Sequence, residues 1–211
     1  MTAAPLIGLD FDNTIVLYDD VFRAVGTECG LLPEGFQGGK DAVRSHVRAQ
    51  HDGEARWTAL QAKVYGPGIR RALPAPGLFE FLAAARSHGV RLAIVSHKTM
   101  VAAADPHGVN LRDAARDWIA VHGLTDPARG GIDPADVHFE STRAEKIARI
   151  RALGCRVFID DLEEVFEEAD FPLGVDRILV KHGAPSLPTG PFRAFRSWPE
   201  IANDLFARLA A

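Results

Sequence analysis

Two aspartates stand one residue apart after a short apolar run near the N-terminus, in the segment Leu6-Ile7-Gly8-Leu9-Asp10-Phe11-Asp12-Asn13-Thr14. Carboxylates this close repel each other unless a cation or a reaction requires both of them. A buried strand gains nothing by ending in two like charges, so the pair is a candidate for metal binding or catalysis. The plain alternative is a strand that runs into a solvated acidic turn.

Polar residues also follow two later apolar runs. Ser96 comes after the run 92–95, and Asp160 and Asp161 come after the run 157–159. In parallel sheets, ligands bind beyond the carboxyl ends of the strands. If the strands that carry these residues are neighbours of the first one, all the polar ends converge on one crevice.

Thr142 and Glu145 predict a capping box that begins a helix, and Lys146 lies in the first turn of that helix, near the partial positive charge of its N-terminus. This placement costs a little helix stability but suits an anion site. Taken singly, Lys146 is an ordinary solvated lysine, Ser96 a turn residue, and Asp160-Asp161 a helix N-cap. Their occurrence together, in this order, makes coincidence a poor explanation.

The predicted crevice has a definite chemistry. Several carboxylates cannot all stay ionised there without a cation, and oxygen ligands favour Mg²⁺, which commonly acts beside phosphate. The Ser96 hydroxyl and the Lys146 ammonium can bind phosphate oxygens, while one aspartate attacks phosphorus and another transfers protons. Further candidates for substrate contact are the polar neighbours of these positions, namely Asn13, His97, Lys98 and Arg143.

The elements that must position these residues alternate along the chain. Short apolar runs at 6–10, 91–95, 137–139, 156–159 and 177–180 predict strands, and amphipathic segments between them predict helices. This alternation indicates an α/β fold, with a three-layer, Rossmann-like core around a parallel sheet. Residues 41–65 predict two helices with few large apolar side chains and many charges, as expected for a small α-helical cap insertion.

Composition excludes several other classes of protein. The chain has 211 residues, 47% of them hydrophobic, and a net charge of −4, which gives no reason to expect nucleic acid or an anionic membrane as a partner. The N-terminal residues lack the pattern of a signal peptide. Cys29 and Cys155 fit no metal or redox spacing, so we expect reduced thiols in a cytoplasmic protein. No feature of the sequence specifies an oligomeric state.

Four motifs between Leu6 and Phe166 resemble those of the haloacid dehalogenase superfamily of aspartate-nucleophile phosphohydrolases. The first is Asp10-Phe11-Asp12-Asn13-Thr14, which matches the family pattern Asp-x-Asp-x-Thr. The others are Ser96 after its strand, Lys146 before the next strand, and Asp160-Asp161 after that strand. The first motif is fairly specific and the others are weak singly, but all four in order are strong evidence.

The resemblance implies a role for each motif residue. Asp10 would be the nucleophile, and Asp12 the general acid/base that protonates the leaving oxygen and later activates water. Thr14, Ser96 and Lys146 would bind the phosphoryl group, and Lys146 would also balance the charge of Asp10.

The resemblance also implies a bound Mg²⁺. Asp10, the backbone carbonyl of Asp12 and one of Asp160 or Asp161 would hold the ion. Asp160 is favoured as the direct ligand and Asp161 as its partner.

Two further expectations follow from the resemblance. Dehalogenases and phosphonate-cleaving members lack the second aspartate, so Asp12 favours hydrolysis of phosphate esters. Asn13 replaces the commoner glycine, and asparagine also tolerates a left-handed backbone. The domain division expected is a core of residues 1–17 and 74–211, with residues 18–73 as a small helical cap that restricts access to small substrates.

The leading hypothesis is a Mg²⁺-dependent phosphomonoester hydrolase acting on a small phosphorylated metabolite. One alternative is a nucleotidase of the same superfamily, which the paired aspartates and the aromatic residues Phe36, Trp57 and Tyr65 of the expected cap would suit. Another is a catalytically silent regulatory module, whose sign would be a missing motif residue, and none is missing here.

Overall fold

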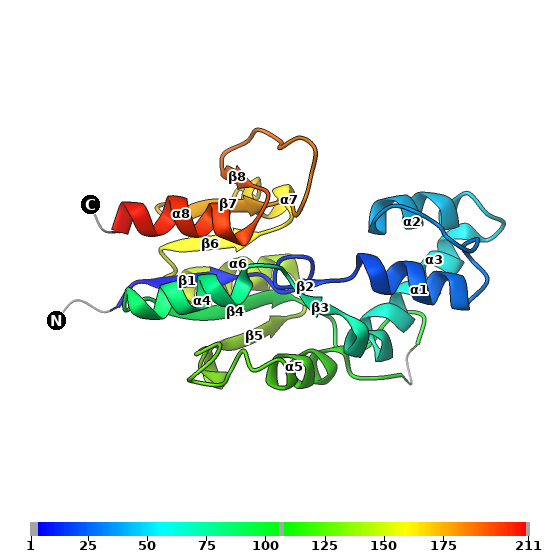
Figure 1. Cartoon of the computed structure of the whole chain (residues 1–211), viewed down its shortest axis with the longest axis horizontal. Helices are drawn as coiled ribbons and strands as arrows, with labels where there is room; N and C mark the ends of the chain where they lie inside the picture. The colour runs from blue at the N-terminus through cyan, green and yellow to red at the C-terminus, as the bar shows by residue number, and fades with distance from the viewer. Residues whose placement is uncertain (1–3, 106–107, 210–211) are drawn as a thin grey trace. The chain divides into compact units, whose positions relative to one another are not determined.

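The computed structural model describes residues 4–105 and 108–209. It contains a six-stranded parallel sheet (Figure 1). Its order is β5-β4-β1-β6-β7-β8, and every neighbouring pair is parallel. The strands are β1 (Leu6–Leu9), β4 (Arg91–His97), β5 (Val137–Glu140), β6 (Val157–Asp160), β7 (Asp176–Val180) and β8 (Arg193–Phe195).

Helices flank both faces of this sheet. One side carries α4 (Leu78–Ser87) and α8 (Trp198–Leu209), which pack together through the ring of Phe81 against Trp198. The other side carries α6 (Arg143–Leu153) and the short α7 (Glu163–Phe166). The predicted fold class, a Rossmann-like α/β core with a parallel sheet, is therefore confirmed.

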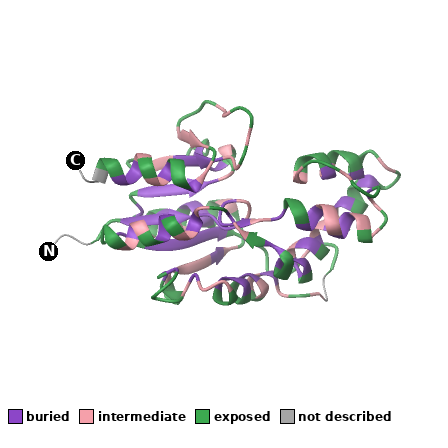
Figure 2. Cartoon of the chain, in the orientation of Figure 1, coloured by how far each residue is buried: buried purple, intermediate pink, exposed green. Residues whose placement is uncertain are grey.

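The core of the sheet lies where alternating strand residues meet α6 and α7. Buried side chains from strands and helices form one cluster there, including Ala93, Val95, Ile147, Ile150 and Phe158. Figure 2 shows the central strands β1, β4 and β6 mostly buried while the outer faces of the helices are exposed. This burial is the main stabilising term, because about 25 cal/mol is gained for each Å² of apolar surface removed from water.

The chain divides into two compact units. The first consists of Met1–Ile15, Pro74–Lys98 and Ala120–Ala211, and the second of Val16–Leu73 and Thr99–Ile119. The second unit thus includes residues 99–119 as well as the insertion expected from the sequence. That the insertion acts as a cap stays a prediction, and residues 1–3, 106–107 and 210–211 lie outside the described part of the chain.

The second unit is mainly helical. It contains α1 (Asp19–Glu28), α2 (Lys40–Arg48), α3 (Gly53–Tyr65), a 3-10 turn at Pro67–Arg71 and most of α5 (Leu111–Val121). Two short strands, β2 (Val16–Leu17) and β3 (Leu73–Pro74), pair where the chain enters and leaves the insertion.

Aromatic side chains make the core of the second unit. Phe22 stacks on Trp57 with ring centroids 5.2 Å apart, and Tyr65 contacts both Phe22 and Tyr18 edge to face. Trp57 is 2% exposed, so its ring is a packing element of this unit.

Two smaller expectations can be checked in the same structure. Cys29 and Cys155 are free thiols, as expected, and burial raises the pKa of Cys155 to about 11. Among the described helices, none combines the length and apolar character required to cross a membrane.

Candidate active site

The register of β1 places Asp10 at the point where three strands end. Leu9 pairs with Ile94 of β4 on one side and with Ile159 of β6 on the other. The backbone N–H of Asp10 donates to the Ile159 carbonyl at 2.8 Å, which continues the β1–β6 ladder by one residue. The strands that carry Ser96 and Asp160 are therefore the two neighbours of β1.

A buried lysine lies between two buried aspartates at this edge. Lys146 Nζ donates to Asp10 Oδ1 at 2.7 Å and to Asp160 Oδ2 at 2.6 Å. All three side chains are almost completely buried. Lys146 comes from the start of α6, which begins with the predicted capping box of Thr142 and Glu145. The capping box fixes the first turn of the helix and so fixes the position of the Lys146 backbone.

The charges of this cluster are strongly coupled. Burial by itself lowers the pKa of Lys146, but Asp10 and Asp160 outweigh it and raise that pKa above its usual range, so the lysine is an ammonium ion. Burial raises the pKa of Asp160 to about 6, against the opposing effect of Lys146, and the nearby charge of Asp10 adds to the rise. A second cation near these carboxylates would relieve their repulsion.

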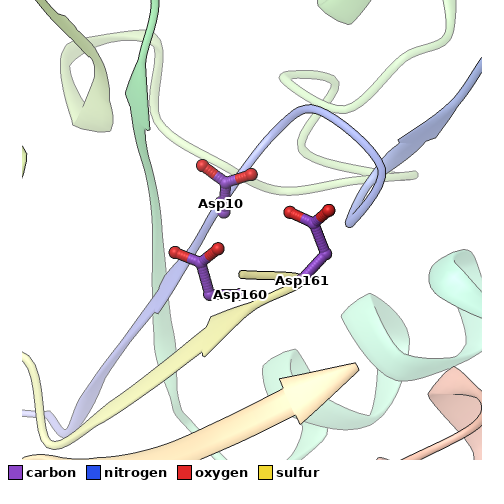
Figure 3. A group of neighbouring side chains, drawn as sticks. All are labelled: Asp10, Asp160 and Asp161. Carbon is purple, nitrogen blue, oxygen red and sulfur yellow. The ribbon is translucent and has the colours of Figure 1, made fainter. Parts of the chain in front are cut away.

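Asp161 brings a third carboxylate to the same place. Oxygens of Asp10, Asp160 and Asp161 lie within 4.8 Å of one another. Figure 3 shows the three carboxylates converging from the end of β1 and the end of β6. Hard oxygen donors at this spacing suit a divalent cation such as Mg²⁺. The residues therefore fit the metal expected from the sequence.

The turn after β1 is tight and carries a buried hydroxyl. Asn13 has φ 58°, the left-handed conformation that asparagine tolerates, and the Ile15 N–H donates to the Phe11 carbonyl at 3.0 Å. Thr14 is fully buried, and its Oγ1 has no hydrogen-bond partner among the described residues. Burying a hydroxyl without a partner lowers the stability of the fold, so a hydrogen bond between this atom and a ligand oxygen would be favourable.

The backbone of Thr14 is held from the far end of the chain. Its carbonyl accepts hydrogen bonds from His182 Nε2 at 3.1 Å and from Trp198 Nε1 at 3.3 Å. Trp198 is completely buried, and His182 is half-buried. Sequence analysis missed both residues, because a histidine in a loop and a tryptophan at a helix start carry no recognisable motif.

The other candidate residues take different positions. Ser96 is buried at the end of β4, where it pairs with Phe139 of β5. His97 is exposed and its Nε2 lies 2.9 Å from the Ser141 carbonyl. Arg143 is paired with Glu168 at 2.9 Å. The contacts of His97 and Arg143 are thus with groups other than the clustered carboxylates.

Lys98 has a partner that the sequence did not suggest. Its Nζ lies 2.8 Å from Asp12 Oδ2 and 3.1 Å from Asp12 Oδ1. Each of the two motif aspartates, Asp10 and Asp12, therefore has a buried lysine of its own, Lys146 for the first and Lys98 for the second.

The stability of this site should depend on pH through His182. Burial lowers the pKa of His182 in the folded protein, against the smaller opposing effect of its hydrogen bond to the Thr14 carbonyl. The unfolded chain, with a histidine pKa of about 6.5, then binds more protons than the folded one below that pH. We expect the free energy of unfolding to fall as the pH drops below about 6.5.

Urea unfolding of wild type and of His182→Gln at pH 7.5 and pH 5.5 measures this dependence. The variant should lose less stability than wild type between the two pH values. His51→Gln, which removes an exposed imidazole from the second unit, is the control. An equal loss in wild type and His182→Gln would show that this histidine does not carry the effect.

Solved structures resemble the whole chain in fold. Protein tyrosine kinase A from Mycobacterium tuberculosis has a TM-score of 0.61 and 19% identity, over 97% of this chain and 99% of that chain. A predicted phosphoglycolate phosphatase from Haemophilus somnus has a TM-score of 0.59 and 16% identity, over 97% of this chain and 99% of that chain. A HAD family hydrolase from Deinococcus radiodurans with bound phosphate and sodium has a TM-score of 0.56 and 19% identity, over 98% of this chain and 97% of that chain.

Sequence comparison adds no closer relative. No protein-family model matches the chain, and no curated protein sequence matches it. The similar structures bear names of different activities, a kinase and hydrolases, so at these identities they define a fold and not a reaction. The resemblance inferred from the four motifs is confirmed at that level: the chain has the α/β fold of the haloacid dehalogenase-like hydrolases.

Proposed function

We propose that this protein is a Mg²⁺-dependent phosphomonoester hydrolase that acts on a small phosphorylated metabolite. The observation that carries the proposal is the buried Lys146 ammonium ion shared between Asp10 and Asp160. Such a cluster costs desolvation free energy, and buried ionisable groups with strongly shifted pKa values gather at functional sites, which favours a catalytic reason for it.

The residues of the chain suggest how the reaction would run. A carboxylate oxygen of Asp10 attacks phosphorus, the bond from phosphorus to the ester oxygen breaks, and that oxygen takes a proton from Asp12. Water then attacks the aspartyl-phosphate, Asp12 takes the proton from water, and Asp10 is released with inorganic phosphate. Thr14 Oγ1, Ser96 and Lys146 would bind the phosphoryl oxygens and hold the group in line with Asp10.

The metal would be held by Asp10, the backbone carbonyl of Asp12 and the pair Asp160 and Asp161. When bound, Mg²⁺ would neutralise charge on the transferring phosphoryl group. Asp160 already accepts hydrogen bonds on both oxygens, from Lys146 and from the Leu162 N–H at 3.0 Å, so its orientation is fixed in advance. We propose it as the direct ligand, with Asp161 as its partner.

Metal binding should be visible as stabilisation without any substrate. A cation that binds the folded chain at 100 times its dissociation constant adds about 2.7 kcal/mol to the free energy of unfolding. We expect MgCl₂ to raise the melting temperature of wild type, and the rise to be lost in Asp160→Asn and reduced in Asp161→Asn. Asp170→Asn, a change of an exposed aspartate in the same unit, should keep the full rise.

The Mg²⁺-induced shift is the quantity to compare, because Asp160→Asn also changes the pairing of Lys146 and so alters the melting temperature by itself. An Asp160→Asn variant with an unchanged shift would remove Asp160 from the proposed metal site.

A screen of phosphorylated metabolites, with and without Mg²⁺, tests the proposed function and identifies the substrate. Phosphate release by wild type with Mg²⁺ supports the proposal. Inactivity across a broad panel would favour the alternative of a catalytically silent regulatory module.

One argument for the nucleotidase alternative is weakened, because the Trp57 ring is packed within its own unit. The cytoplasmic location and the absence of nucleic-acid and membrane partners stay predictions.

A further inference from the structure

The second buried lysine, Lys98, contacts the second motif aspartate. Both Asp12 oxygens accept from its ammonium group, at 2.8 and 3.1 Å. We infer that Lys98 is a positioning residue that orients the Asp12 side chain for proton exchange: Asp12 enters the reaction with a proton on one oxygen, passes it to the leaving group, and keeps its contact with Lys98 through the other oxygen. The inference rests on the proposed function, in which Asp12 is the general acid/base.

The sheet fixes the backbone of Lys98. His97 pairs with Glu140 of β5, and the Lys98 N–H donates to the Glu140 carbonyl at 2.8 Å, which extends the β4–β5 ladder one residue beyond the strand. The Glu140 side chain is held in turn by Arg149 of α6 at 2.7 Å. A lysine whose backbone is held this firmly can place its ammonium group reproducibly.

The surroundings of the ammonium group favour Asp12 as its partner. The side chain of Lys98 is 3% exposed, and its Nζ lies 5.5 Å from the centre of the Phe11 ring. Phe11 is itself buried and packs edge to face on Phe139 of β5. A cation with little access to water needs a close anion, so removing one partner of this pair costs more than it would on the surface.

Asp12 is the more exposed member of the pair. Its side chain is 24% exposed, and it is a single β-bridge residue just before the turn at 13–15. Without a partner, a carboxylate there would sample several rotamers, and an error of about 1 Å in a catalytic group can cost about 10²-fold in rate. Two contacts from one rigid ammonium group select a single orientation while leaving one side of Asp12 open to solvent and substrate.

The test compares two substrates that differ in how much they need a proton donor. The leaving group of an alkyl phosphate is a strongly basic alkoxide unless its oxygen is protonated. The p-nitrophenolate of p-nitrophenyl phosphate leaves readily without a proton. The ratio kcat/KM covers steps up to formation of the aspartyl-phosphate, and so includes protonation of the leaving oxygen by Asp12 but not the later attack of water. We expect Lys98→Met to lower kcat/KM for glycerol phosphate by about 10²-fold, and that for p-nitrophenyl phosphate by less than about fivefold.

Three further variants separate positioning from other roles. Asp12→Asn combined with Lys98→Met should lose no more than Asp12→Asn alone, since both changes remove one function. Lys98→Arg should recover part of the alkyl phosphate activity, and Lys98→Gln, which keeps an N–H donor, gives a second comparison in case Lys98→Met does not fold. Arg91→Met removes an exposed ion pair at the opposite end of β4 and should leave both substrates unaffected.

The possible results are distinct. An equal loss on both substrates, or losses that multiply in the double variant, would overturn the positioning role and leave the hydrolase proposal standing. A wild-type protein that is inactive with Mg²⁺ on both substrates and across the whole panel of phosphorylated metabolites would overturn the proposed function and this inference together.

Discussion

Asp10→Asn is expected to abolish phosphate release, lowering kcat by about 10⁴-fold or more, as removal of other catalytic nucleophiles does. An amide oxygen is a poor nucleophile, so the aspartyl-phosphate cannot form in the variant. The fold should survive, because Asn can still accept a hydrogen bond from Lys146 and that lysine keeps its ion pair with Asp160 at 2.6 Å. The measurement is Mg²⁺-dependent release of phosphate from the best substrate of the metabolite screen.

Two controls make the Asp10 result specific. A melting temperature close to that of wild type shows that the loss is chemical and not a loss of folding. Acid quenching of wild type during turnover, followed by peptide mass spectrometry, should find phosphate on the peptide that contains Asp10 and none on that peptide in the variant. Full activity of Asp10→Asn would refute the assignment of Asp10 as nucleophile.

Lys146→Met is expected to cause the second large effect, on stability as well as on activity. The change leaves the buried carboxylates of Asp10 and Asp160 without the cation that they share. Breaking a buried ion pair from one side costs about 3–5 kcal/mol, so the free energy of unfolding should fall by about that amount. Turnover should also fall strongly, because the variant lacks the ammonium group proposed to bind the phosphoryl oxygens.

Urea unfolding in the presence of EDTA measures the stability of Lys146→Met. Added MgCl₂ should stabilise the variant more than wild type, since a metal ion can replace part of the missing positive charge. The matched control is Lys181→Met, whose pair with Glu163 is longer at 3.4 Å and about one-third exposed on both sides. That control should cost about 0–1 kcal/mol. Equal losses in the two variants would mean that burial of the cluster has no special energetic role.

The sequence by itself determined the order of elements and the identity of most candidate site residues. Apolar runs that end in Asp10, Ser96 and Asp160 predicted parallel strands, and the structure supplies the condition for their convergence, because β4, β1 and β6 are adjacent in the sheet. Thr142 and Glu145 predicted the start of α6 through a capping box, which depends only on residues three positions apart. Such features are legible because hydrophobic periodicity and caps are local.

The extent of the inserted unit was decided by tertiary contacts. The proline and glycine residues of the sequence suggested an insertion limited to residues 18–73. In the structure, residues 99–119 are grouped with that insertion. The stack of Phe22 on Trp57 likewise places an aromatic residue in the core of that unit that could, by sequence alone, have been a ligand contact. Which side of a helix is buried depends on its neighbours, and these are unknown until the chain is folded.

The tertiary structure decided which side chains far apart in the sequence are in contact. Lys146 lies 136 positions from Asp10, and Lys98 lies 86 positions from Asp12, so no local pattern relates them. His182 and Trp198, which hold the Thr14 carbonyl, are 168 and 184 positions away from it. These pairings follow from the order of strands in the sheet, because that order sets which strand ends and loops lie side by side. The two aspartates one residue apart were evident from the sequence, and the family resemblance implied Lys146 as the partner of Asp10, but nothing in the sequence indicated Lys98 as the partner of Asp12.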